Sequence, residues 1–175
     1  MSDRWVSAIY CDDLRHEIGG KVSHMGVYAS EMVLPRFPFT LPRLVAMVRL
    51  RTPLGHAPEK VRFAIYRDAV KLAESEMRLS DEKLVDDGSE DRSYYVVCYF
   101  AFGALEFSGK AEIRLRCICD DEEIIGNSLM VRLANEEEAR TFNFPLPTPA
   151  PSSDAIKAPK SGSRPARARS KKLAD

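Results

Sequence analysis

Two short acidic segments hold the side chains of this chain that are best suited to chemistry. Asp12 and Asp13 end an apolar run near the start, and Asp120 and Asp121 open a run of four acidic residues. Carboxylates that converge from several loops at one end of a β-sheet protein can bind Ca²⁺ through their oxygens. Acidic residues are equally typical of solvated turns, in which Asp12 or Asp13 would pair with Arg15 or Lys21. We favour solvated turns and keep a calcium or small-ligand site as an alternative.

Histidine and cysteine could in principle support nucleophilic catalysis. His16, His24 and His56 lie in three different segments without the spacing of metal ligands. A site built from Cys11, one histidine and Asp12 can be drawn, but nothing in the sequence defines its geometry. The chain contains no glycine-rich phosphate loop and neither a G-x-S-x-G nor an H-E-x-x-H motif. We therefore expect a protein that is not an enzyme and that has no cofactor.

The four cysteines, Cys11, Cys98, Cys117 and Cys119, lie in segments with β-strand patterns. Cys117 and Cys119 place two sulfurs on one face of a strand, whereas zinc sites use pairs with two intervening residues and a second pair elsewhere. The chain starts without a charged-then-apolar signal pattern and has no apolar run long enough to span a bilayer as a helix. We expect a cytoplasmic protein whose cysteines are reduced thiols.

Residues 145–175 differ in composition from the rest, because Pro, Ala, Ser, Lys and Arg dominate there. The basic residues are Lys157, Lys160, Arg164, Arg167, Arg169, Lys171 and Lys172. Such a segment is too polar to offset its ordering entropy by burial, which predicts a disordered tail. Its positive charge makes contact with nucleic acid or with an acidic partner an alternative function.

Arginines on several predicted strands could line one basic sheet face, beside Tyr95 or Tyr99, that suits an acidic or nucleic-acid partner. They are Arg43, Arg49, Arg51, Arg62, Arg114 and Arg116. The other interpretation is the solvated outer face of a sheet, over which each Arg stem lies on its neighbours. We favour the second, because the residues before Asp154 carry more acidic than basic side chains.

Eight segments before the tail alternate apolar and polar residues and are separated by Gly, Pro and Asp turns, a pattern that predicts β-strands. They are Val6–Cys11, Lys21–Leu34, Arg43–Arg51, Lys60–Arg67, Val70–Met77, Tyr94–Phe107, Ala111–Cys119 and Ile124–Leu133. The best helical candidate is the short segment Ser80–Val85. Eight short strands with almost no helix predict an antiparallel sandwich of two sheets.

One hairpin can be predicted in register. A two-residue turn over 108–109 would pair the segments on either side of it. Phe102 would then face Leu115 and be buried, and Cys98 would face Cys119. The side chains that share this face are almost all apolar, which favours one buried face and one solvated face.

Three short segments follow one another in a distinctive order near the start: Ala8–Arg15, Gly20–Ser23 and Gly26–Tyr28. They resemble the opening of an uncharacterised domain family of bacteria and phages, in which Cys-Asp-Asp-(Ile/Leu)-Arg precedes Gly-Lys-x-Ser and Gly-(Val/Ile)-Tyr. Phe37–Pro42, Val48–Arg51 and Phe63–Asp68 fit the same pattern, whereas His24-Met25 replaces a more aliphatic pair. The resemblance covers about residues 5–135 and implies a bacterial or prophage origin without implying an activity.

We therefore predict an all-β protein: an antiparallel eight-stranded β-sandwich over residues 1–144, followed by the disordered tail 145–175. The function we expect is a non-catalytic interaction module that presents a sheet edge or a loop rim to a protein partner, without contact to a membrane.

Overall fold

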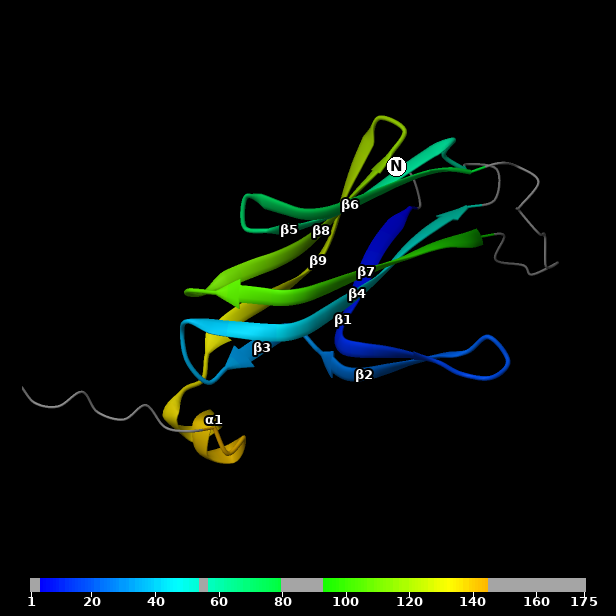
Figure 1. Ribbon diagram of the computed structural model, residues 1–175. Coiled ribbons are helices and arrows are strands. Elements are labelled where there is room, and N and C mark those ends of the chain that lie inside the picture. Colours follow the sequence, from blue (N-terminus) through cyan, green and yellow to red (C-terminus); the bar gives the residue numbers. More distant parts are fainter. Residues whose placement is uncertain (1–3, 54–56, 80–92, 145–175) are drawn as a thin grey trace, which may run out of the picture.

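The computed structural model describes residues 4–53, 57–79 and 93–144, which form two packed β-sheets and one short helix (Figure 1). The predicted two-sheet fold is confirmed, but these residues contain nine strands instead of eight. The elements are β1 (Trp5–His16), β2 (Val22–Tyr28), β3 (Glu31–Leu34), β4 (Phe39–Pro53), β5 (Lys60–Arg67), β6 (Val70–Arg78), β7 (Ser93–Phe107), β8 (Ala111–Cys119), β9 (Glu122–Leu133) and α1 (Glu136–Thr141). The segment Ser80–Val85 and the tail 145–175 lie outside the described residues.

The strands are ordered β2-β1-β4-β7 in a four-stranded sheet and β3-β9-β8-β5-β6 in a five-stranded sheet. The predicted strand Lys21–Leu34 is wrong as one element, because the chain bends at Ala29-Ser30 and passes from one sheet to the other. Its second part, β3, pairs parallel with β9, so the sandwich is not purely antiparallel.

The core lies between the sheets and follows from alternation along the strands. In β8 every second residue, from Ala111 to Cys119, is buried, and the residues between them are half-buried. Phe63 and Ile65 of β5 are fully buried beside them. Burying a large apolar side chain of this kind stabilises a fold by about 1.5–3 kcal/mol.

The predicted hairpin over 108–109 is wrong, because β7 and β8 belong to different sheets. A two-residue hairpin turn needs a positive φ at a central residue, and neither Ser108 nor Gly109 has one. The turn instead carries the chain across the end of the sandwich. Cys98 therefore lies opposite Val48 of β4 and not opposite Cys119.

The same correction applies to Phe102, which lies opposite Leu44 of β4 and not Leu115. Phe102 is partly buried against the core, not fully buried as predicted. All four cysteines are free, and Cys117 Sγ lies 3.7 Å from Cys119 Sγ on the inner face of β8.

Two aspartates in tight turns tie β5 to β8 at both ends. Asp68 and Asp120 each have a positive φ, which an Asp tolerates better than most residues. The Asp68 carboxylate accepts a hydrogen bond from the Glu112 amide, and the Asp68 amide donates to the Glu112 carbonyl. Asp120 forms the same two hydrogen bonds with Lys60. The β5–β8 ladder is thus closed by one aspartate at each end.

A bulge in β9 links the two sheets on the opposite side. Gly126 and Asn127 together lie opposite Leu115, and a Cβ at residue 126 would collide with the Leu115 side chain. The Asn127 amide accepts from the Ala8 N–H (2.7 Å) and donates to the Ala8 carbonyl (3.0 Å). The pairing of β1 with β2 ends at Tyr10, so Ala8 has no partner on β2. The Asn127 side chain pairs with the Ala8 backbone in its place.

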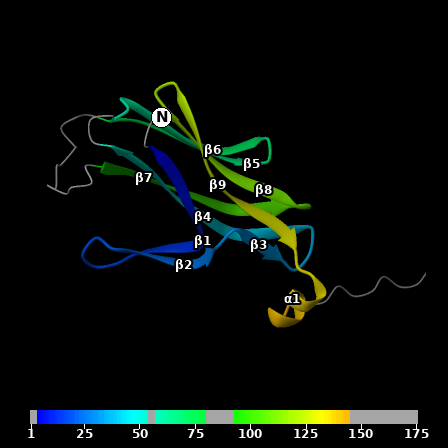
Figure 2. The ribbon, with the colours of Figure 1, turned by 180° about the vertical axis from the view of Figure 1, so that it is seen from behind.

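The helix α1 follows β9 and was not predicted. Asn135 and Glu138 form a reciprocal capping box at its start. Arg132 binds the carboxylates of both Glu138 and Glu31, and so joins α1 to β3. In both ribbon views α1 lies at the end of the molecule away from the N-terminus (Figures 1 and 2).

Candidate functional site

The acidic residues singled out in the sequence do not converge. Glu122 forms an ion pair with Arg4, so the β8–β9 turn, with Asp120 and Asp121, lies beside the start of β1. Asp12 and Asp13 lie eight residues or more farther along that strand, which corresponds to about 25 Å for an extended chain. Among the described residues these carboxylates do not form a group that could hold a metal ion.

Asp12 and Asp13 have local contacts instead. Asp12 accepts a hydrogen bond from the Tyr28 hydroxyl and lies over Gly26, where a Cβ would collide with its carboxylate. Burial and then this hydrogen bond raise the pKa of Tyr28. Asp13 forms an ion pair with Arg43 (3.1 Å), and not with the near neighbours in sequence that we expected.

The described residues of the imagined nucleophilic site, Cys11 and His24, make other contacts. Cys11 is buried, with its Sγ near the Asp13 carbonyl, and burial raises the pKa of the thiol, which opposes formation of a thiolate. His24 Nε2 lies 3.2 Å from Met47 Sδ. Within the described ranges no group of three or more His, Cys, Asp or Glu residues could hold a metal ion. His56 lies outside those ranges.

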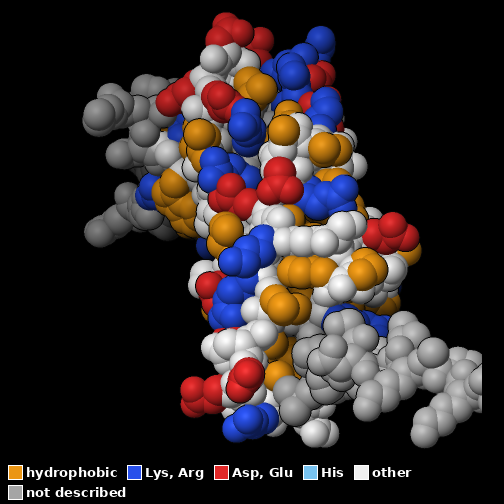
Figure 3. Space-filling view, turned by 90° about the vertical axis from the view of Figure 1, so that its left-hand side faces the viewer, with side chains coloured by type: hydrophobic (Ala, Val, Ile, Leu, Met, Phe, Trp, Pro, Cys, Tyr) orange, Lys and Arg blue, Asp and Glu red, His pale blue; other side chains and the backbone are white. Residues whose placement is uncertain are grey.

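The six arginines do not share one basic face, because they belong to both sheets. On the five-stranded sheet, basic side chains form ion pairs with neighbouring carboxylates: Lys60–Glu76, Arg62–Glu76, Arg114–Glu112 and Arg116–Glu123. A view of one side of the molecule shows Lys, Arg, Asp and Glu side chains interspersed (Figure 3). The arginines on the outer face of the five-stranded sheet are therefore paired locally with carboxylates, and Arg116 also lies 4.9 Å from the Tyr66 ring centre.

The outer face of the four-stranded sheet is different in kind. Its residues near the N-terminal end are mostly aromatic, apolar or arginine, and we call five of them the Trp5 surface: Trp5, Arg49, Tyr95, Val97 and Tyr99. Their strands β1, β4 and β7 are adjacent, so the side chains form one continuous area. The exposed fractions are 38% for Trp5, 50% for Tyr95, 41% for Val97 and 43% for Tyr99.

Arg49 lies over the edge-to-face pair of aromatic rings on this surface. Its guanidinium carbon lies 5.2 Å from the Trp5 ring centre and 5.1 Å from the Tyr95 ring centre. The rings are 6.3 Å apart at 69°, an edge-to-face arrangement. Both cation–π contacts hold the Arg side chain in place. Arg49 Nε is buried without a hydrogen bond among the described residues.

Toward the other end, the same outer face is covered. β1 bends part-way along its length, and its second half projects with β2 as an arm (Figure 1). The contact of His24 with Met47 places this arm over the sheet. Cys11 and Val45 belong to the outward-facing rows of β1 and β4, yet both are fully buried. The part of the face around Cys11 and Val45 is therefore not accessible to a partner, whereas the part around Trp5 is exposed.

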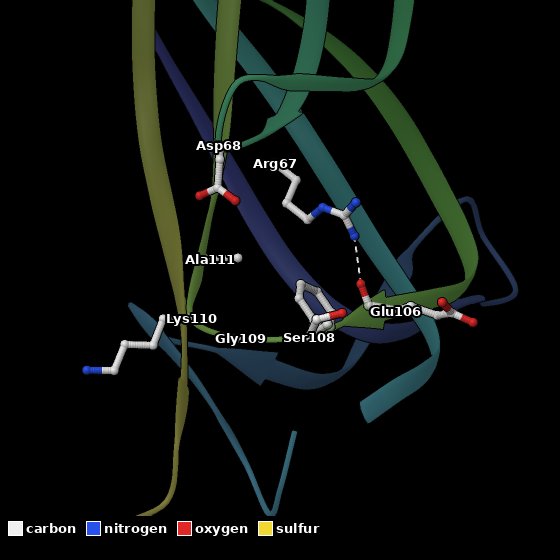
Figure 4. Close-up of a pocket in the computed structure, with 8 residues that line it drawn as sticks. Arg67, Asp68, Glu106, Ser108, Gly109, Lys110 and Ala111 are labelled. Atoms are coloured by element: carbon white, nitrogen blue, oxygen red, sulfur yellow. Dashed lines mark hydrogen bonds between the residues drawn. The ribbon is translucent and has the colours of Figure 1, made fainter. Parts of the chain in front are cut away.

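A hollow of about 220 Å³ lies at the β7–β8 crossing (Figure 4). Arg67 points across it and donates to the Glu106 carbonyl (2.7 Å), and Asp68 is held by Glu112. These side chains already serve to join β5, β7 and β8, so the hollow is a structural junction.

Comparisons with known proteins add no assignment: no family model matches the chain, and none of the curated proteins matches it. In the part of the chain that the structure describes, no helix is long and apolar enough to cross a membrane.

Sequence reasoning missed the Trp5 surface. Tyr95 and Arg49 appeared only as members of a supposed basic face, and Trp5 had no assigned role. The three residues come from strands far apart in sequence, and only the pairing of β1, β4 and β7 brings them together. The seven basic residues of the tail lie outside the described residues.

Proposed function

We propose that this protein is a non-catalytic interaction module that binds a protein partner through the Trp5 surface. The observation that carries the proposal is the contact of the Arg49 guanidinium with the adjoining rings of Trp5 and Tyr95, both partly exposed to solvent. Trp, Tyr and Arg are the residue types most enriched among those that dominate binding energy at protein interfaces. A rigid aromatic pair also loses little conformational entropy on binding.

The chemistry of the surface limits the partner. The exposed apolar area favours an apolar or aromatic patch, and the Arg49 donors favour a carboxylate or a carbonyl in the middle of it. On the outer face of the five-stranded sheet, by contrast, Arg62, Arg114 and Arg116 each form an ion pair with a carboxylate, although Ile125 and Met130 are exposed there as well. The proposal thus assigns the two outer faces different roles.

The test uses full-length protein to capture its partner from cells that express it, followed by affinity measurement with the purified partner. Tyr95→Ala should weaken binding by about tenfold or more. Ile125→Ala is the matched control, because Ile125 is 59% exposed on the outer face of the five-stranded sheet. A partner that binds both variants as tightly as the wild type would contradict the assignment.

A further inference from the structure

The two sheets differ by one strand, and the mismatch lies on the side of β6 and β7. Both are edge strands, and in the two ribbon views both lie on the same side of the sandwich, with β6 extending beyond β7 (Figures 1 and 2). β5 lies over the end of β7, since Arg67 at its end reaches the Glu106 carbonyl. β6 therefore has no strand opposite it among the described residues.

Burial along β6 shows the consequence. The inner residues of β5 are Val61, Phe63 and Ile65, and all three are fully buried. Their direct neighbours on β6 are Met77, Ser75 and Ala73, and all three are only half-buried. The inner face of β6 thus continues the core surface but is open to solvent on one side.

The edge of β7 lies beside this open surface. β7 pairs with β4 and, within the described residues, with no other strand. It carries no charged side chain from Ser93 to Leu105. β6, by contrast, carries Lys71, Glu74, Glu76 and Arg78, which are charges of the kind that protect edge strands from pairing with other chains. A long unprotected edge is a template for strand addition.

We propose that β7 accepts one extended, uncharged segment of a partner protein as a fifth strand of its sheet. That strand would pair with β7 at the usual spacing of about 4.8 Å and cover the inner face of β6. The inference rests on the proposed function, since it specifies how the partner of the Trp5 surface is held. Tyr95, Val97 and Tyr99 would flank the outward side chains of the added strand, and Ala73, Ser75 and Met77 would contact the inward ones.

Charge and available space favour a single segment of a partner beside β7 over a second copy of this chain or its own tail. A second copy that paired through its own β7 about a twofold axis perpendicular to the sheet would bring its β5 into the space occupied by β6. The tail of this chain is unsuited, because six prolines and several basic residues lie between 145 and 175. An uncharged segment matches the uncharged edge and leaves no buried charge unpaired.

The probe for this site is a labelled peptide of about ten residues with alternating Thr and Val and a Lys at each end. Its binding to full-length protein is measured by fluorescence anisotropy, and hydrogen exchange reports which amides become protected. We expect saturable binding together with slower exchange in β7. Absence of binding, or protection confined to other strands, would overturn the proposal.

Two variants test the position of the added strand. Ser75→Lys places a charge on the inner face of β6 and should weaken peptide binding by about tenfold or more. Val70→Lys is the control, because Val70 is 57% exposed at the start of the same strand. Thermal unfolding checks that both variants fold. If a variant does not fold, hydrogen exchange of the wild-type protein with and without the peptide still tests the proposal. Equal binding by the two variants would overturn the proposal.

The outcomes also separate this inference from the proposed function. If the natural partner is lost with Tyr95→Ala but kept with Ser75→Lys, the Trp5 surface binds and strand addition is wrong. If sedimentation shows a dimer of wild-type protein with β7 protected from exchange, the occupant is a second copy, which also overturns the inference.

Discussion

The outer faces of the two sheets differ in the side chains that surround their arginines. On the five-stranded sheet, Arg62, Arg114 and Arg116 each lie beside a carboxylate, so the face is solvated and electrically balanced. On the four-stranded sheet, Arg49 contacts two adjoining aromatic rings, whereas on the five-stranded sheet Arg116 contacts one ring, that of Tyr66, and a carboxylate as well. The neighbours of a strand arginine, and not its presence on a strand, therefore determine the character of the surface around it.

The first prediction tests whether the side chains of the Trp5 surface belong to the core. Phe63→Ala, on the inner face of β5, should lower the free energy of unfolding by about 3–5 kcal/mol. Tyr95→Ala should lower it by less than about 1 kcal/mol, since the ring is half exposed. Urea unfolding of both variants measures the difference. Similar losses for the two would make the Trp5 surface structural.

The second prediction concerns the link that keeps the two sheets in position. Asn127→Ala removes both hydrogen bonds to the Ala8 backbone and should destabilise the protein by about 1–2 kcal/mol. Ser128→Ala is a control at the next position of β9. Hydrogen exchange at Ala8, which should become faster in the Asn127 variant alone, gives a local readout.

The third prediction concerns the balanced face. Arg114→Ala removes a partly exposed ion pair with Glu112 and should change the free energy of unfolding by about 0.5 kcal/mol or less. The same variant should bind the partner of the Trp5 surface normally. A large loss of stability or of binding would show that the five-stranded sheet also has a specific role.

The smallest effect is expected at Glu138 of α1. Its hydrogen bonds from Arg132 and from the Asn135 amide lower its pKa from 4.5 to about 2. Since the folded-state pKa is lowered, this carboxylate contributes stability above pH 4.5 that is lost as the pH falls toward 2. NMR signals of α1 should therefore change in that range, and Glu138→Gln should remove the change. Glu137→Gln, one residue away, should leave it intact.

Much of the fold follows from the sequence, because strand periodicity determines which side chains turn inward. The alternation of β8 was sufficient to identify its buried face. The alternation could not identify the neighbours of β8. Two strands with apolar inner faces have the same sequence pattern whether they pair in one sheet or face each other across the core from two sheets. That ambiguity led to the wrong pairing of Phe102 with Leu115.

The candidate site could not be predicted in the same way. Trp5, Arg49 and Tyr95 meet through pairings between strands more than forty residues apart, and no local pattern records such pairings. The helix α1 was predictable in principle, because Asn135 and Glu138 have the spacing of a capping box. Its six residues are too few to give a helical period.

The paired turns at Asp68 and Asp120 have a consequence for how this domain can change over time. Each aspartate is hydrogen-bonded to the backbone at the end of the neighbouring strand. Both contacts can form only if β5 and β8 have matching lengths. A residue inserted in either strand would separate one aspartate from its backbone partners and turn every following side chain to the opposite face. We therefore expect related sequences to vary in length elsewhere, and these two strands to evolve by substitution alone.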